Sequence, residues 1–578
     1  MINIQAPISS NNQVKMINKM KIMAVVAIIL FYLAVITFYS EILLNGDAGY
    51  AYLHMREILL GHHFDFLYKS VSYCGVIELF FSALYSMLLP VKAALPLGML
   101  TYYAIGFFLL RKNYPVGSRF GLLLILFLPL PNPFYQSFAA LSGHTFSLFT
   151  FFILAHFLSR PQYRNADGGW KWSALICIGF ASGFGVYGYQ LSKLAAYPCL
   201  LVLCIFELSA FFWKLKKQIF MSPPYLKSWG TLASKIAVVW FSFRVGLLPR
   251  KISMAYFGSE HLMSGGPKVN LHMNHWFEKG KTFQDVLSRI FTPIWEHHWV
   301  KVGNFTHFNY PIHDVITQSS SVSFWIGVIV IGGFTVGAAV VLVKQFLIPR
   351  MSKPYLLQID AYLLYLFGST LTFLLGYFVR SDFDANTIHE SRYLLTLYFA
   401  PLMGLLYLMP RFQTIIGLIS TVALLSHFTV IQANFRNLSQ IKSEKSCESL
   451  AQSQVYEVLK RIEPNALAGS YWEVWSSAAY LNQAHVYDFR HDRFHFNHTE
   501  TLRRKLVIIV PSVDYLATDE AKLHFEKLKG RQFESTHLGP YLFFFEKDIV
   551  KAPHGWAAVI DPIVADYGKS HCNFSSAT

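Results

Sequence analysis

The chain has 578 residues, of which 54% are hydrophobic, 16% aromatic and only 14% charged. So little charge excludes an ordinary soluble protein of this length and predicts an all-α polytopic membrane protein. The formal net charge is +16, but the lysines and arginines gather beside apolar segments. They therefore reflect membrane topology, and we expect no nucleic-acid partner.

The first predicted transmembrane span covers residues 22–44, an almost unbroken apolar run that is long enough to cross a bilayer. Lys15, Lys19 and Lys21 precede it, which predicts a cytoplasmic N-terminus. The run is too long for a signal-peptide core and lacks a small-residue cleavage site, so we expect it to be retained. Asp47 then emerges at the outer surface of the membrane.

Ten further apolar runs give about eleven predicted spans: 94–110, 119–131, 134–158, 172–190, 194–213, 231–248, 322–343, 357–379, 392–409 and 412–431. Basic clusters follow the runs that this count sends inward, as the positive-inside rule requires. The alternation holds only if 76–90, which Pro90 ends, does not cross. We expect an interfacial or partly inserted helix there.

Three segments are predicted to lie outside the membrane: the loops 45–93 and 249–321, and the tail 432–578. The tail combines amphipathic helices near 448–462 and 519–530 with β-rich runs at 505–511 and 540–546. This pattern predicts a small extracytoplasmic α/β domain that follows a transmembrane domain over 1–431. Cys447 and Cys572 bracket the tail, where a disulfide and two free thiols both fit the sequence.

Acidic and aromatic side chains crowd the first outer loop, namely Asp47, His54, Glu57, Asp65, Tyr73 and Glu78. If 48–60 is helical, Asp47 lies at its start, where the helix dipole favours a carboxylate. Leu53, Ile58 and Leu59 would then face the membrane. Asp47 can be a simple N-cap, and that role is compatible with a role as a base.

Polar residues in or beside apolar spans are the other candidates. His144 and Gln190 are expected to face the interior of the bundle, either for function or for an interhelical hydrogen bond. Pairs such as His62-His63 and His297-His298 can bind a divalent metal, although none has the spacing of a strong motif. The cofactor is therefore unknown, and a divalent metal stays open.

The first loop resembles the C-type superfamily of membrane glycosyltransferases, the relatives of dolichyl-phosphate-mannose–protein mannosyltransferases. The resemblance is carried by Asn-Gly-Asp-Ala-Gly-Tyr-Ala-Tyr at 45–52, Ile-Leu-Leu-Gly-His at 58–62 and Tyr-Cys-Gly-Val-Ile-Glu at 73–78. It implies that Asp47 is the catalytic carboxylate. Many members have a second acid directly after the first. Here that position is Ala48, which puts a paired-carboxylate metal site in doubt and makes Glu78 the substitute.

The similarity extends to Ser142-Gly143-His144, to Arg-Tyr-Leu-Leu-Thr-Leu-Tyr at 392–398 and to the tail segment 470–475. It implies that Arg392 and Tyr393 bind the phosphate of the donor, because a guanidinium can hold a phosphate through two hydrogen bonds. Arg392 as an ordinary interface anchor is the alternative. The remaining substrate-site candidates are Tyr50, His54, Tyr73, His144, Gln190 and His389.

The resemblance implies an enzyme that moves a hexosyl or pentosyl group from a polyprenyl-phosphate donor to a glycan, lipid or protein acceptor on the outer face. Such an enzyme acts in cell-envelope glycan biosynthesis, in the inner membrane if the source is bacterial. One alternative is a surface-polysaccharide polymerase or ligase, which would rely on outer-loop arginines, and 249–321 offers only Arg250 and Arg289. The other is a transporter, but inverted repeats and charges inside helices are not evident.

Overall fold

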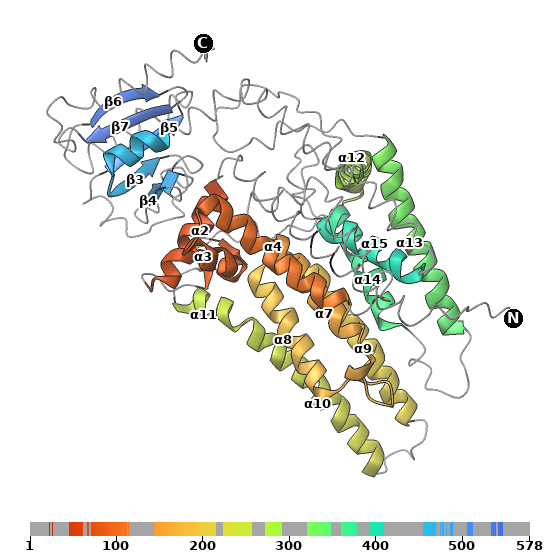
Figure 1. Ribbon diagram of the computed structural model, residues 1–578. Coiled ribbons are helices and arrows are strands. Elements are labelled where there is room, and N and C mark those ends of the chain that lie inside the picture. Colours follow the sequence, from red (N-terminus) through yellow and green to blue (C-terminus); the bar gives the residue numbers. More distant parts are fainter. Residues whose placement is uncertain are drawn as a thin grey trace.

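The structure is a computed structural model. It describes residues 22, 26, 46–61, 66–68, 71–111, 114, 144–215, 223–256, 272–291, 321–347, 360–379, 394–409, 455–469, 474, 477–478, 481, 486–488, 506–511, 533–538 and 541–546. Most of this part of the chain is helical, and a small β-sheet follows near the C-terminus (Figure 1).

Long apolar helices form the body of the molecule. They are α4 (Val91–Leu110), α7 (His144–Leu158), α8 (Trp172–Gly188), α9 (Lys193–Leu215), α10 (Pro223–Gly246), α13 (Ser321–Leu347), α14 (Ala361–Val379) and α15 (Leu395–Leu408). Four helices of the described part are long and apolar enough to cross a membrane, or five if one bent pair counts as a span. The chain is thus an integral membrane protein. The total of eleven spans stays a prediction, because 119–131 and 412–431 lie outside the described residues.

Helices α8 and α10 approach each other closely because α8 carries glycines four residues apart. A Cβ atom on Gly179 would lie 2.7 Å from the carbonyl oxygen of Val239, and one on Gly183 would collide with the carbonyl of Phe243. On the facing helix, a Cβ on Gly246 would lie 2.5 Å from the carbonyl oxygen of Phe180. Small residues at this spacing let membrane helices pack backbone to backbone.

Three helix ends that the sequence places on the same side of the membrane lie together in the structure. The loop before α8, the start of α14 and the end of α15 lie together, since Tyr407 donates a 2.5 Å hydrogen bond to Asp360 and both interact electrostatically with Arg164. The sequence assigns all three positions to the cytoplasmic side. Which side of the membrane this end faces remains a prediction.

The segment 249–321 contains more structure than a simple outer loop. Helix α11 (Leu248–Tyr256) continues α10 after a bend of 48°. Helix α12 (Met273–Phe291) packs against α13, α14 and α15 and buries Leu287, Ile290 and Phe291. An apolar face at helical spacing within a polar segment explains this burial.

The C-terminal part contains a five-stranded mixed sheet, which lies beyond one end of the bundle (Figure 1). Its strands are β3 (Ala466–Gly469), β4 (Val486–Asp488), β5 (Leu506–Pro511), β6 (Phe533–Leu538) and β7 (Tyr541–Glu546), in the order β4-β3-β5-β7-β6. Strand β3 pairs parallel with β4 and β5, while β5-β7-β6 is antiparallel. The predicted strands at 505–511 and 540–546 match β5 and β7.

The helix predicted near 448–462 is helical over 455–462, and it precedes β3 directly. Val455, Val458 and Leu459 on this helix are buried. The helix predicted at 519–530, together with Cys447 and Cys572, lies outside the described residues.

Candidate active site

Helix α2 (Gly46–Leu59) places the predicted catalytic carboxylate at the start of a helix. Asp47 is its second residue, so the first-turn position expected from the sequence is confirmed for the backbone. Leu59 is exposed and Ile58 partly so, but the prediction that Leu53 faces the membrane is wrong, because Leu53 is only 2% exposed. The helix packs its other faces against the following elements, which bury more of its surface than an interfacial helix would.

Two candidate substrate residues of α2 are buried side by side. Tyr50 and His54 are 3% and 1% exposed, and their ring centroids lie 5.9 Å apart. They are one helical turn apart, so they lie on the same face of α2. This face points into the protein and not toward lipid.

A short hairpin carries the chain from α2 to the second predicted acid. Strands β1 (Leu67–Tyr68) and β2 (Val71–Gly75) lead into the 3-10 helix η1 (Val76–Leu79) and then α3 (Phe80–Ser86). The residue before β1, Phe66, is bound by side chains of two other helices. Its N–H donates to Ser253 Oγ on α11 (3.0 Å), and its carbonyl accepts from the hydroxyl of Tyr187 on α8 (2.8 Å).

Gly75 allows the hairpin to lie directly against α8. A Cβ atom at this position would meet the ring of Tyr187 at 2.8 Å, so any larger residue would push the strand away. Glu78 follows three residues later, and its position therefore depends on this close approach.

Glu78 is fully buried on η1, with 0% exposure. The hydroxyl of Tyr102 on α4 donates a hydrogen bond to the carbonyl of Ile77, and Glu78 interacts electrostatically with the same tyrosine. Helix α2 packs against η1, so Glu78 belongs to the same site as the face formed by Tyr50 and His54. A buried carboxylate is costly to desolvate, which favours a functional role over an incidental one.

Gln190 lies at the same end of the bundle, in the 3-10 helix η4 (Gln190–Ser192) between α8 and α9. With its amide oxygen turned toward α11, it accepts hydrogen bonds from both terminal nitrogens of Arg250, at 2.5 and 2.8 Å. Arg250 also interacts electrostatically with Lys193, the first residue of α9. Both groups are cations, so they attract an anion to this end of the bundle.

The structure thus brings Tyr50, His54, Glu78 and Gln190 to one end of the bundle. Tyr73 lies in β2 and His144 begins α7, but these two, like Asp47, are described only in their backbone. Arg392, Tyr393 and His389 lie outside the described residues, so their predicted roles stay predictions.

Lys193 and Arg250 were not among the predicted site residues. Both flank predicted spans on the outer side, where the positive-inside rule leads one to expect few cations. Lys193 and Arg250 could have been identified from the sequence, because they are basic residues on the side where this rule predicts few.

A metal site is not evident in the part of the chain that the structure describes. No three His, Cys, Asp or Glu side chains there lie close enough to hold an ion. The pairs His62-His63 and His297-His298 lie outside that part.

No protein-family model matches the chain, and no curated protein matches it. Among solved structures, it is similar to the crystal structure of ArnT from Cupriavidus metallidurans bound to undecaprenyl phosphate. The two chains are 11% identical, the match covers 94% of this chain and 99% of that one, and the TM-score is 0.41. A likeness this distant assigns neither residues nor a substrate, so the function has to be inferred from the chain's own site.

Proposed function

We propose that this protein is a membrane glycosyltransferase that transfers a sugar from a polyprenyl-phosphate donor to a glycan, lipid or protein acceptor. The active site would lie on the outer face, at the end of the bundle that carries α2, η1, η4 and α11. The observation that carries the proposal is the combination of a buried acid, Glu78, with the Lys193–Arg250 cation pair at one end of an apolar bundle. Transfer from a lipid phosphate requires both kinds of group at the membrane surface.

In the proposed reaction, Asp47 accepts the proton of the acceptor hydroxyl, with Glu78 as the second acid of the site. The oxygen of that hydroxyl forms a new bond to the anomeric carbon of the sugar, while the bond from this carbon to the phosphate oxygen breaks. The bonding electron pair leaves with the polyprenyl phosphate. Lys193 and Arg250 stabilise the negative charge of this leaving group, as Arg392 was expected to do from the sequence.

The connections between the elements support one shared site. Arg250 and Ser253 lie on the same short helix, and Ser253 binds the backbone at Phe66, which leads into the hairpin before Glu78. Tyr187 binds the same residue from α8, whose C-terminal end is followed by Gln190. The cation pair and the acid are thus anchored to one small framework.

The test compares Asp47→Asn, Glu78→Gln and Arg250→Gln with matched controls. Asp47 is the second residue of α2, and Asn keeps its size, so Asp47→Asn loses the base and only the modest helix-dipole stabilisation of about 0.3–1 kcal/mol. Removing a general base typically lowers the rate by about 10²–10⁴. Glu57→Gln on α2 and Lys251→Gln beside Arg250 change charge in the same helices and should leave transfer almost unchanged.

The measurement is mass spectrometry of cell-envelope glycans and lipids from a deletion strain that expresses each variant at equal level. We expect the modification to disappear with the three site variants and to persist with both controls. Full modification with Asp47→Asn would overturn the role of Asp47. Shortened glycans of unchanged composition would favour a polymerase, and an unmodified precursor trapped on one side of the membrane would favour a transporter.

A further inference from the structure

We infer that a second site, at the opposite end of the bundle, binds the phosphate head group of an anionic phospholipid. The site is a cavity of about 220 Å³ between the end of α9 and the start of α10. Its lining includes Glu207, Phe211, Lys214, Lys227 and Lys235. This inference does not depend on the proposed transferase activity.

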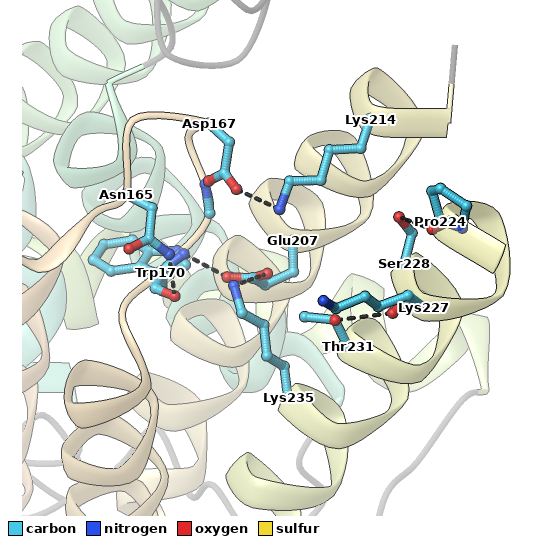
Figure 2. A network of polar contacts seen from close by, with 11 residues as sticks. Asn165, Asp167, Trp170, Glu207, Lys214, Pro224, Lys227, Ser228, Thr231 and Lys235 are labelled. Carbon is cyan, nitrogen blue, oxygen red and sulfur yellow. Dashed lines mark hydrogen bonds and ion pairs between the residues drawn. The ribbon is translucent and has the colours of Figure 1, made fainter. Parts of the chain in front are cut away.

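The charge of the cavity favours an anion. Among the described residues, three lysines line it, Lys214, Lys227 and Lys235, against one acid, Glu207. Figure 2 shows the ammonium group of Lys235 directed toward Glu207 and that of Lys214 directed toward Asp167. A lysine ammonium has three donors, so each can bind a phosphate oxygen in addition to a protein partner.

The acids near the cavity are already engaged. Glu207 accepts from Lys235 Nζ at 2.7 Å through one carboxylate oxygen and from the Trp170 N–H at 2.5 Å through the other (Figure 2). Asp167 lies 2.5 Å from Lys214 Nζ. Three lysines against these two acids leave one net positive charge, so a bound anion would be attracted and not repelled.

The size of the cavity suits a head group. Its volume of about 220 Å³ far exceeds the roughly 10–15 Å³ that a cavity needs to hold one water molecule. This space is large enough for a phosphate ester with a small polar substituent.

The surroundings favour a lipid over a soluble phosphate. Large apolar side chains next to the cavity are exposed on the outside of the two helices, namely Leu208, Phe212, Leu226, Trp229 and Ile236. Trp229 packs edge-on against Phe211, a lining residue, with ring centroids 4.4 Å apart. Trp side chains gather at membrane interfaces, and basic pockets between membrane helices bind anionic lipid head groups. The acyl chains would lie along the exposed apolar side chains.

Native mass spectrometry of the detergent-purified full chain tests this site. The probes are dioleoyl-phosphatidylglycerol, its zwitterionic counterpart dioleoyl-phosphatidylcholine, and soluble glycerol 3-phosphate. We expect preferential binding of phosphatidylglycerol. Since a lysine near a membrane surface contributes about 1 kcal/mol to anionic lipid binding, Lys227→Gln should weaken it about fivefold.

Lys227 is the right residue to change because it is exposed and lies on α10 away from the buried Lys235–Glu207 pair. Lys227→Glu should weaken binding further, while Lys344→Gln, an exposed lysine in the last turn of α13, should leave it unchanged. Equal loss with Lys344→Gln, or equal binding of phosphatidylcholine, would overturn the site. Binding of glycerol 3-phosphate as tight as that of the lipid would overturn the lipid as its ligand.

Discussion

The buried ion pair between Glu207 on α9 and Lys235 on α10 should respond strongly to the loss of one partner. The two side chains are 9% and 7% exposed, and their charged atoms lie 2.7 Å apart. Lys235→Met would leave the Glu207 carboxylate buried with only the Trp170 N–H as a described partner. Breaking a buried pair in this way typically costs about 3–5 kcal/mol.

The double variant Glu207→Gln/Lys235→Met separates this effect from simple misfolding. Replacing both charges by uncharged groups of similar volume is often neutral or stabilising, because neither charge must then be desolvated. We therefore expect each single variant to be less stable than the double variant. Since the unfolding entropy of 578 residues is about 1.2 kcal/mol/K, the midpoint should be lower by about 2–4 °C.

Thermal unfolding of the protein in nanodiscs, followed by tryptophan fluorescence, measures these midpoints. Lys344→Met removes an exposed lysine from α13 and controls for the loss of a positive charge. If the double variant lost as much stability as the two single variants added together, Glu207 and Lys235 would not be coupled. That result would refute the ion pair.

Three further predictions concern pH, packing and topology. Burial raises the pKa of Asp167, but the hydrogen bond and charge of Lys214 outweigh burial and hold this pKa below its usual 3.8. The contribution of Asp167 to stability should therefore be present at neutral pH and lost as pH falls below about 4. Asp167→Asn should remove this acid-dependent part of the unfolding curve. Gly75→Ala should displace the hairpin from Tyr187 and so lower both the thermal unfolding midpoint and the amount of modified glycan. An unchanged midpoint and unchanged glycan would contradict the close packing. Single cysteines in a cysteine-free background should react with an impermeant thiol reagent in intact cells within 260–320 but not within 112–118, and the reverse pattern would invert the topology.

The sequence alone determined most of the described secondary structure. The predicted spans 194–213, 322–343 and 357–379 correspond closely to α9, α13 and α14. In a lipid bilayer, a long apolar segment must satisfy its backbone hydrogen bonds internally, so a helix is almost the only solution. The break at Pro90, between α3 and α4, was predictable for a similarly local reason, since a proline lacks the N–H that a helix interior needs.

The tertiary structure alone decided which polar residues meet. Gln190 and Arg250 are 60 positions apart, and Glu207 and Lys235 are 28 apart, yet each pair is in hydrogen-bond contact, the first with the Gln190 amide oxygen turned toward α11. The interpretation that the helices carry no internal charges was wrong, because Glu207 and Lys235 form a buried ion pair between α9 and α10. Hydropathy is a property of a local segment and says which residues enter the membrane, but not which face of a helix meets a neighbour. Leu53 illustrates the difference, because its place on an amphipathic helix predicted exposure and the packing of α2 against η1 and α3 buried it.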